Sequence, residues 1–426
     1  MPPGEGQQSI ARASPACTAS VHLQTPLATW LSIQASLPEP KLATLPLGDA
    51  LGHVLQRPVR ADRDLPPADR SGMDGYAVRA ADLTGAPVKL ALLGEVAAGS
   101  PPSLGVNPGT CVRIFTGANL PPGADTVVRL EDTRPGNAGR IVVTVCEAKG
   151  ANLRHRGEDA CRGDVLVPAG AAIGPVPLGL CASVGSTHLQ VVRKPKVAII
   201  ATGRELLALG AETAAHQERD ANGPLLAATL RENSFAAVLV ERVSDDRDAI
   251  AAKLREALAA ADAVILSGGV SVGAYDFVPA ATRAVGARTI VHGVAMRPGK
   301  PFLFAVAPDG QPIFALPGNP LSAAVGLHEF ILPALRRMAG FPDPSCRPLL
   351  RARLRAPVSN PTGLQRHLLG TLTTARGMEV KVVPNRSSGD LVAGAIADGT
   401  VILPPDALQV AAGSLVDFRP WRRWPW

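Results

Sequence analysis

The chain has 426 residues, of which 46% are hydrophobic, and it carries a formal net charge of +7. This length exceeds what one hydrophobic core supports, so we expect several domains. With only 4% aromatic residues and no apolar stretch long enough to span a bilayer, the composition argues against nucleic-acid binding and against a membrane helix. The mildly positive charge suits an anionic small substrate.

The six cysteines lie far apart and form no C-x-x-C pair. Neither a zinc site nor a disulfide framework is indicated, and a reducing cytoplasm fits the chain. Residues 1–21 lack a continuous apolar core, so we expect a disordered extension and no secretory signal. Gly (42) and Pro (40) are abundant without a Gly-x-y period, which predicts many short strands joined by turns.

The first folded segment is expected to be helical. Beginning at Pro26, apolar residues such as Trp30 and Ile33 are spaced for one buried face, and prolines at positions 38 and 40 interrupt the helix. Apolar residues within 47–55 predict a second short helix. The Gly-, Pro- and Ala-rich segment 167–185 indicates a return to this unit, so we place a discontinuous helical domain at residues 22–58 and 163–193.

A β-rich module, residues 59–162, is predicted between the two halves of the helical domain. Short β-type runs are separated by Gly- and Pro-rich turns, as an antiparallel module requires. The runs are 88–93, 111–115, 126–130 and 141–145.

Strands alternate with helices in residues 194–341. The apolar strands begin near Val197, Ala237 and Ala263, and helical segments at 225–233 and 246–260 lie between them. This alternation predicts a parallel sheet with right-handed crossovers. Short strand-like runs return after Pro342, so residues 342–426 are expected to form a small β domain.

The strand 263–266 leads directly into a glycine-rich loop, Ser267–Gly273 (SGGVSVG). Ligands of open α/β sheets bind beyond the carboxyl ends of the strands, where glycines let backbone N–H groups converge on phosphate oxygens. Asp276, just beyond the loop, is a candidate ligand for a divalent metal. A tight turn that binds nothing is the alternative interpretation.

Two further segments of this region suit an anion. In 316–320 (LPGNP), Asn319 is placed to cap the following helix, whose free N–H groups favour negative charge. In 296–301 (MRPGKP), Arg297 and Lys300 flank a Pro-Gly turn and would present positive charge to an oxyanion. Each segment alone is compatible with ordinary structure, but the three loops together favour a phosphate-bearing ligand.

The β module displays acidic and hydroxyl side chains. Asp74 lies just before an expected strand, Thr116 follows the run 111–115, and Asp159 lies near the end of the module. Such groups coordinate metals or transfer protons, although a bare Asp-Gly pair is more often a turn. The residues alone predict a Mg²⁺-dependent enzyme that acts on a phosphorylated ligand.

Taken in order, these segments resemble the molybdopterin molybdenumtransferase family, which includes MoeA and the gephyrin E domain. The resemblance covers about residues 22–426. Six motifs carry it: SGMDGYAVR (71–79), TGA (116–118), RGED (156–159), SGGVSVG (267–273), PGKP (298–301) and LPGNP (316–320).

The resemblance implies a multidomain α/β plus β fold. A β module is inserted in a discontinuous, elongated helical domain, and a central parallel-sheet molybdopterin-binding domain and a C-terminal β-barrel-like domain follow. It also implies a homodimer whose active site lies between the β module of one subunit and the α/β domain of the other. The implied reaction converts adenylylated molybdopterin and molybdate, with Mg²⁺, into molybdenum-bound pterin and AMP. The implied protein partners are molybdopterin adenylyltransferase and acceptor molybdoenzymes.

The family's functional residues, carried over by motif, fall into three groups. The implied catalytic residues are Asp74, Asp159 and Thr116, and the implied metal ligands are Asp276, Glu205 and Asp74. The pterin, its phosphate, the nucleotide and molybdate are implied to contact Ser267, Gly268, Gly269, Ser271, Gly273, Arg297, Lys300, Pro301, Gly318, Asn319 and Ser388.

The sequence departs from the family pattern at several positions. Arg204 replaces the acid of the usual T-G-D-E segment, a charge reversal expected to weaken metal binding unless the arginine contacts phosphate. Arg70 stands in place of an asparagine, and Leu364 in place of an arginine for which Arg366 is a candidate substitute. A D-x-N element survives at 220–222.

These departures leave two alternatives open. One is a divergent paralogue that binds the pterin as a carrier or scaffold without catalysis. The other is the related pterin adenylyltransferase, which shares the α/β domain; the front half of the chain argues against it, because that enzyme lacks the module that carries MDGYA.

Overall fold

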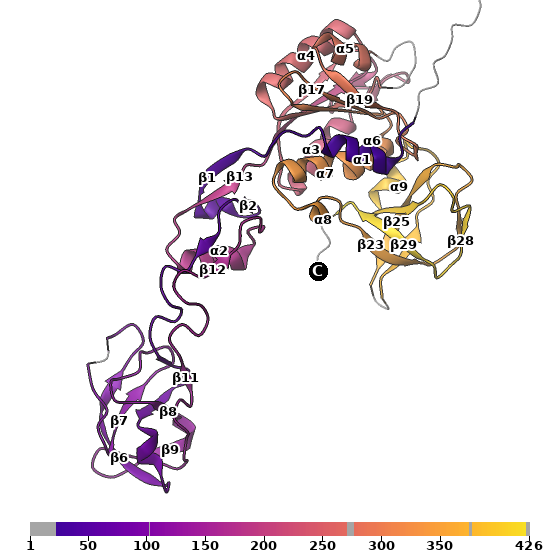
Figure 1. The fold of residues 1–426 in the computed structure, drawn as a ribbon. Coiled ribbons are helices and arrows are strands. Elements are labelled where there is room, and N and C mark those ends of the chain that lie inside the picture. Colours follow the sequence, from indigo (N-terminus) through magenta and orange to yellow (C-terminus); the bar gives the residue numbers. More distant parts are fainter. Residues whose placement is uncertain (1–22, 102, 271–276, 375–376, 423–426) are drawn as a thin grey trace, which may run out of the picture. The chain divides into compact units, whose positions relative to one another are not determined.

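The computed structural model describes residues 23–101, 103–270, 277–374 and 377–422. The chain divides into two compact units (Figure 1). Unit 1 combines residues 1–41 with 193–426, and unit 2 is the continuous segment Leu42–Val192. None of the described helices has the length and apolar character that crossing a bilayer requires.

A six-stranded sheet in the order β17-β14-β18-β22-β21-β19 forms the centre of unit 1. The first four strands are mutually parallel, as predicted, and only β21 is reversed. The reversal follows from the short turn between β21 and β22, since a tight hairpin joins only antiparallel strands. The strands are β14 (Lys196–Thr202), β17 (Ala236–Val243), β18 (Ala263–Ser267), β19 (Arg288–His292), β21 (Leu303–Val306) and β22 (Pro312–Leu316).

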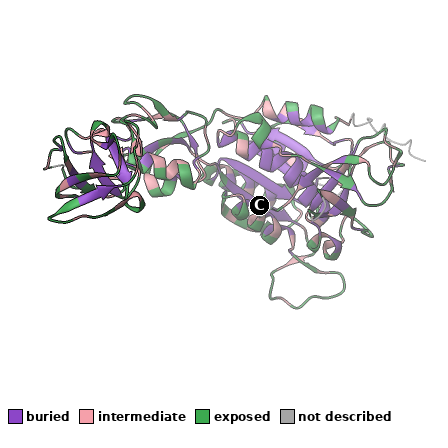
Figure 2. Cartoon of the chain, turned by 90° about the horizontal axis from the view of Figure 1, so that it is seen from below, coloured by how far each residue is buried: buried purple, intermediate pink, exposed green. Residues whose placement is uncertain are grey.

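Helices cover both faces of this sheet (Figure 1). Side chains alternate along a strand, so Val197 and Ile199 of β14 join one core cluster while Ala198 and Ile200 join the other. The buried strands between the exposed helix faces are visible in Figure 2. One face carries α4 (Arg247–Ala260) and α5 (Val278–Ala284); the other carries α1 (Pro26–Gln34), α3 (Asn222–Glu232), α6 (Pro320–Gly326) and α7 (Leu332–Met338).

A closed five-stranded barrel forms the last part of unit 1. Its strands pair in the ring β25-β26-β23-β29-β27 and back to β25, around a core that includes Val380, Val401 and Phe418. This arrangement confirms the predicted C-terminal β-barrel. The barrel strands are β23 (Leu350–Leu354), β25 (Gln365–Thr373), β26 (Glu379–Val382), β27 (Gly399–Leu403) and β29 (Leu415–Pro420); α8 (Asp343–Cys346) precedes them, α9 (Leu391–Ala395) lies between β26 and β27, and β24 (Val358–Ser359) pairs with β28 (Gln409–Val410).

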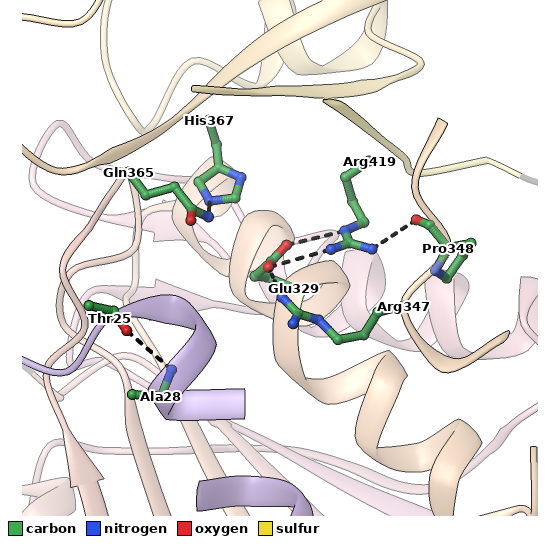
Figure 3. Close-up of polar contacts among 8 residues, drawn as sticks. All are labelled: Thr25, Ala28, Glu329, Arg347, Pro348, Gln365, His367 and Arg419. Atoms are coloured by element: carbon green, nitrogen blue, oxygen red, sulfur yellow. Dashed lines mark hydrogen bonds and ion pairs between the residues drawn. The ribbon is translucent and has the colours of Figure 1, made fainter. Parts of the chain in front are cut away.

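A buried ionic cluster links the barrel to the helical stretch 320–338. Glu329 lies in the π-helical turn Leu327–Ile331 that joins α6 to α7, and it is 2% exposed. Arg419 of β29 donates from Nε to Glu329 Oε2 at 3.1 Å, and Arg347 forms a second ion pair with Glu329 (Figure 3). Burial opposes ionisation of Glu329, but the two guanidinium groups outweigh it and hold the Glu329 pKa below its ordinary value.

The chain passes from unit 1 to unit 2 after Lys41 and returns at Arg193. Arg193 N–H donates to the Lys41 carbonyl at 2.7 Å, and both side chains donate to Asp262 Oδ1 at 2.8 Å. The backbone N–H of Lys196 donates to Asp262 Oδ2 at 2.8 Å. Burial opposes ionisation of Asp262, but these hydrogen bonds hold the Asp262 pKa well below its ordinary value.

Unit 2 contains a six-stranded and a three-stranded sheet with separate apolar cores. The predicted antiparallel pairing is found except between β6 and β7, which are parallel because a long connection returns the chain in the same direction. The six strands are β5 (Gly75–Val78), β6 (Val88–Val96), β7 (Thr110–Ile114), β8 (Thr126–Arg129), β9 (Thr133–Pro135) and β10 (Arg140–Val143); the three are β1 (Leu42–Pro46), β2 (Val54–Leu55) and β13 (His188–Val192).

The predicted helix over 47–55 is wrong. The segment forms only a 3-10 turn, η1 (Leu47–Ala50), and then β2. Its apolar residues have helical spacing, but Leu55 N–H donates to Ala171 O and Gln56 N–H to Gln190 O, so pairing with the returning chain decides the conformation. The returning chain adds α2 (Pro175–Ser183), and two short ladders pair β3 (Val59–Arg60) with β12 (Val165–Val167) and β4 (Arg70–Ser71) with β11 (Leu153–Arg154).

Candidate functional site

A cleft of about 670 Å³ opens in unit 1 beyond the carboxyl ends of β14 and β18. This is the edge of an open α/β sheet at which ligands bind. Six of the residues singled out from the sequence line the cleft, and they come from four separate segments: Glu205, Ser267, Gly269, Pro301, Gly318 and Asn319. Ser271, Gly273 and Asp276 lie outside the described residues.

The turn after β18 requires glycine. Gly268 has φ +100°, and a Cβ at this position would lie 2.3 Å from the carbonyl oxygen of Thr202 on β14. Any side chain would therefore push the loop away from the neighbouring strand. The Gly268 N–H donates to the Leu316 carbonyl at 3.0 Å, and the next residue, Gly269, lines the cleft.

The structure corrects the predicted role of Asn319. Asn319 occupies the N-cap position of α6 as expected, but its side chain makes no capping hydrogen bond to the helix. Its Nδ2 donates to Ser388 Oγ at 2.8 Å, and Leu321 N–H donates to the Ser388 carbonyl at 2.9 Å. The barrel thus supplies Ser388 to the LPGNP segment, and Gly389 and Leu391 beside it line the cleft.

The Pro-Gly turn carries exposed positive charge. Arg297 ends the short strand β20 (Met296–Arg297), which pairs in parallel with β25 so that Arg297 lies opposite Arg366. Lys300 is exposed in the same turn, and Pro301 lines the cleft. The register places Arg366, the suggested substitute for the arginine missing at Leu364, beside the other two cations.

Sequence reasoning missed Asp245 and left Asp220 without a role. Asp245 lies two residues beyond the end of β17, and burial raises the pKa of its carboxyl. Arg204 donates from its backbone N–H to Asp245 Oδ2 at 3.3 Å and from its guanidinium to Asp245 O at 3.3 Å. Asp220 lines the cleft. The rule that functional groups gather at the carboxyl ends of parallel strands would have pointed to Asp245.

In unit 2, Asp74 is displayed at a loop tip. Its Oδ1 accepts hydrogen bonds from the Thr116 backbone N–H at 2.7 Å and from the Thr116 hydroxyl at 2.8 Å, and both residues are exposed. These bonds hold the Asp74 pKa below its ordinary value. Gly75 is required next to it, because a Cβ there would lie 1.9 Å from the carbonyl oxygen of Val128 on β8. The two motifs SGMDGYAVR and TGA thus meet in one site.

Asp159 is in a different environment from Asp74. It forms an ion pair with Arg154, and the pair raises the pKa of Arg154. Two acidic residues that were not predicted from the sequence form hydrogen bonds with the turn that contains Arg156. Asp64 accepts from Arg156 Nε at 2.6 Å, and Asp69 accepts from the Arg156 backbone N–H at 2.8 Å.

Comparison with known proteins identifies related sequences over nearly the whole chain. Residues 21–185 match the MoeA N-terminal region (domain I and II), residues 198–337 a probable molybdopterin binding domain, and residues 351–421 the MoeA C-terminal region (domain IV). Molybdopterin molybdenumtransferase 2 of Mycobacterium tuberculosis is 38% identical over 381 residues, which span 87% of this chain and 93% of that protein. The molybdopterin molybdenumtransferase of a Nostoc species is 33% identical, with 85% of each chain covered.

Solved structures agree with these matches. Two structures of the molybdopterin biosynthesis MoeA protein of Pyrococcus horikoshii superpose with a TM-score of 0.79 each. Their sequences are 30% and 25% identical to this chain, and they cover 94% and 93% of it. Identity of this level over almost the full length of both proteins, on the same fold, shows that the chain belongs to the MoeA family of molybdopterin molybdenumtransferases.

Proposed function

We propose that the protein transfers molybdenum from molybdate to adenylylated molybdopterin, with release of AMP, as a step of molybdenum-cofactor biosynthesis. The cleft beyond β14 and β18 is the observation that carries this proposal. It gathers the Gly268–Gly269 turn and the LPGNP segment around one volume, with the PGKP turn at Pro301. Membership of the MoeA family supplies the substrate class.

The residues of the cleft suit the binding of an anionic substrate. Gly269 of the glycine turn lines the cleft, and a glycine backbone of this kind can approach phosphate oxygens closely. The exposed cations Arg297 and Lys300, with the half-buried Arg366 opposite Arg297, would hold molybdate or a second phosphate. Such fixed charges stabilise the transfer step because they need no reorganisation as charge develops.

We assign the acidic contribution to Asp74, with Thr116 as the group that orients it. The depressed pKa of Asp74 keeps the carboxylate ionised at neutral pH, so it would accept a proton or bind a cation but would not act as an acid. Asp159 forms an ion pair with Arg154, so it would contribute by balancing the charge of Arg154 in this loop. We further propose a homodimer in which one copy supplies these groups to the cleft of the other.

The donor set fits a magnesium ion that the substrate helps to hold. Among the described residues, no three His, Cys, Asp or Glu side chains gather closely enough to bind a metal by themselves. Glu205, Glu218 and Asp220 line the cleft, and Mg²⁺ commonly uses one or two carboxylates together with substrate phosphates. When bound there, the ion would neutralise phosphate charge; Asp276 remains a proposed ligand outside the described residues.

The side chain of Arg204, the position of the charge reversal, does not line the cleft. Its guanidinium donates to the Asp245 carbonyl, and Arg204 is not among the residues that border the cleft. This placement favours the catalytic function over the non-catalytic carrier, because the acids that line the cleft are retained at Glu205 and Asp220.

A molybdate-dependent assay tests the proposal. Purified full-length protein is supplied with adenylylated molybdopterin and Mg²⁺, and AMP is measured with and without molybdate. We expect AMP release that requires molybdate and yields molybdenum-bound pterin. Tight pterin binding without AMP release under any of these conditions would refute catalysis and support the carrier.

A further inference from the structure

Asn222 joins two loops of the cleft that are far apart in the sequence. It is the first residue of α3, is 8% exposed and lines the cleft. Its Nδ2 donates to Ser267 Oγ at 2.8 Å and to the Gly318 carbonyl at 2.7 Å. One amide group therefore connects the glycine-rich turn after β18 with the LPGNP segment after β22.

The orientation of the Asn222 amide follows from its partners. The Gly318 carbonyl can only accept a hydrogen bond, so the nitrogen must face it and both N–H groups are used. The other end of the amide, Oδ1, is buried and has no hydrogen-bond partner within the described part of the chain. A buried acceptor without a donor is costly, so this atom indicates that an occupant of the cleft provides one.

The backbone around Asn222 holds the amide in place. Asp220 Oδ1 accepts from the Gly223 backbone N–H at 2.9 Å, which fixes the first turn of α3. Leu226 and Leu230 on the same helix are fully buried in the core beneath the sheet. The amide is thus held by a helix that is anchored in the core, and it contacts the last residue of β18 and the loop that follows β22.

We infer that Asn222 is a positioning residue that holds the Ser267–Val270 turn and the LPGNP segment in register for the phosphate-bearing ligand. This inference rests on the proposed function for the identity of that ligand. The two donated hydrogen bonds act beside the Gly268 N–H to Leu316 carbonyl bond of 3.0 Å, which joins the same two segments through the backbone. The free Oδ1 accepts a hydrogen bond from an N–H or O–H group of the ligand, because an ionised phosphate oxygen offers no donor there.

The variant Asn222→Asp tests the brace directly. It preserves the shape and an oxygen at the position of Oδ1, but the carboxylate cannot donate a hydrogen bond. It therefore repels the Gly318 carbonyl, and the bond to Ser267 must reverse so that the hydroxyl donates. In the ligand-free protein we expect amide hydrogen exchange to accelerate about tenfold or more in both 267–270 and 316–322, with exchange in the barrel strands unchanged. Unchanged exchange in either loop would overturn the brace.

Asn233→Asp is the matched control, since it makes the same substitution at the other end of α3. Asn233 donates to the Thr229 carbonyl and accepts from Arg336, away from the cleft. We expect it to leave exchange in both loops at the wild-type rate. Equal acceleration of the loops by both variants would mean that α3 merely loosens, and the inference would fail.

Kinetics separate positioning from general damage. Asn222→Asp should raise the KM for adenylylated molybdopterin about 10- to 100-fold, as expected for the lost bond to Gly318 and the reversed bond to Ser267, with the KM for molybdate changed less than threefold. An equal rise in both KM values would contradict the inference. If the wild-type protein neither binds nor converts the pterin, the proposed function fails, while the exchange experiment still decides the brace.

Ser267→Ala covers the case in which Asn222→Asp does not fold. Ser267→Ala removes a single acceptor and is a small change at a buried position. Alone it should accelerate exchange in 267–270 more than in 316–322. Unchanged exchange in 267–270 would refute the link.

Discussion

Asp74 shows how a single carboxylate can be fixed without being buried. Thr116 donates to it twice, from the backbone and from the hydroxyl, and the neighbouring Gly75 lets strand β8 approach closely enough to hold the loop. The side chain therefore keeps one orientation at an exposed tip. Positioned groups of this kind are suited to proton transfer or to cation binding.

Asp74→Asn should abolish turnover while pterin binding stays near the wild-type value. The amide keeps the shape of the side chain but loses the negative charge, and loss of a general base typically costs about 10²- to 10⁴-fold in rate. AMP release and pterin affinity are measured in parallel. Asp164→Asn, a change on an exposed Asp of the same unit, is the control. A large loss of pterin affinity in Asp74→Asn would instead make Asp74 a structural residue.

The residues most easily predicted from sequence were those whose function depends on backbone geometry. Gly268 and Gly318 were singled out because glycines that follow a buried strand can be recognised from the sequence alone. Asn319 was misassigned because its partner, Ser388, lies in a different domain of the chain. The ion pair of Asp159 with Arg154 was not predicted, because outside a helix no regular spacing brings residues five positions apart together.

At the scale of secondary structure, the strongest electrostatic link in unit 1 joins a helix to a barrel strand. Glu329 stands in a π-helical turn, and Arg347 and Arg419 approach it from two other segments (Figure 3). Breaking a buried pair leaves the remaining charges without compensation, which costs more than the pair contributes. The cluster therefore makes the packing of the barrel on the helical stretch highly specific.

Glu329→Gln should lower the free energy of unfolding by about 3–5 kcal/mol, because two buried guanidinium groups lose their counter-charge. Urea denaturation monitored by circular dichroism provides the measurement. Asp417→Asn removes one partner of the exposed Arg351–Asp417 pair on the same barrel and should cost less than about 1 kcal/mol. Equal losses in the two variants would show that burial of the cluster is unimportant.

Two buried histidines beside this cluster predict a pH dependence of stability. Burial lowers the pKa of His328 to about 3 and that of His367 to about 4, from an ordinary value of 6.5. Between pH 6.5 and 5 the unfolded chain binds more protons than the folded chain. The unfolding free energy should therefore fall with falling pH, by up to about 1.4 kcal/mol per pH unit for each histidine.

His367→Gln should remove about half of this slope. The range from pH 6.5 to 5 lies above that in which Glu329 titrates, so the comparison isolates the histidines. Urea titrations at three pH values within this range give the slope for the wild-type protein and for the variant. An unchanged slope in His367→Gln would contradict the buried, neutral state of His367.

The long elements of the α/β region could be read from the sequence, whereas the short ones could not. The helix predicted at 246–260 is α4, Arg247–Ala260, and the strand at 263–266 is β18, because length and period are both clear there. The segment 47–55 has the same period over fewer residues, and contacts with residues 171 and 190 decide its structure. The reversed direction of β21 likewise depends on the short turn before β22, and its effect on strand pairing is seen only in the tertiary structure.

On the scale of the whole molecule, unit 2 is an insertion with adjoining ends. The chain leaves at Lys41 and returns at Arg193, whose backbone groups are hydrogen-bonded to each other at 2.7 Å. The carboxylate of Asp262 accepts hydrogen bonds from both side chains. The discontinuous helical domain predicted at residues 22–58 and 163–193 is a different division of the chain. The meeting of the two ends of unit 2 at one carboxylate lies beyond what composition can show.

Asp262→Asn should expose both connecting segments. The neutral amide loses the charge-assisted bonds to Lys41 and Arg193, which are themselves trypsin cleavage sites. Limited trypsin digestion should cleave at these two positions several-fold faster than in the wild-type protein. Asp248→Asn, on the exposed side of α4, should digest at the wild-type rate; acceleration in both variants would argue against a specific clamp.

Unit 1 should fold without unit 2. A chain in which residues 42–192 are replaced by a two-residue glycine linker should unfold cooperatively on heating, since the main core clusters of unit 1 are formed by its own residues. We expect it to bind the pterin but not to release AMP, because Asp74 and Thr116 are removed. An unfolded product would show that unit 1 depends on the inserted segment.

Because its two ends adjoin, the inserted segment can be lost or exchanged in one genetic event without lengthening any loop of its host. A sheet that binds a ligand and a module that carries acidic groups can then be inherited separately and recombined. Such a junction lets evolution vary the chemistry delivered to a bound cofactor precursor while the pocket that holds it is conserved.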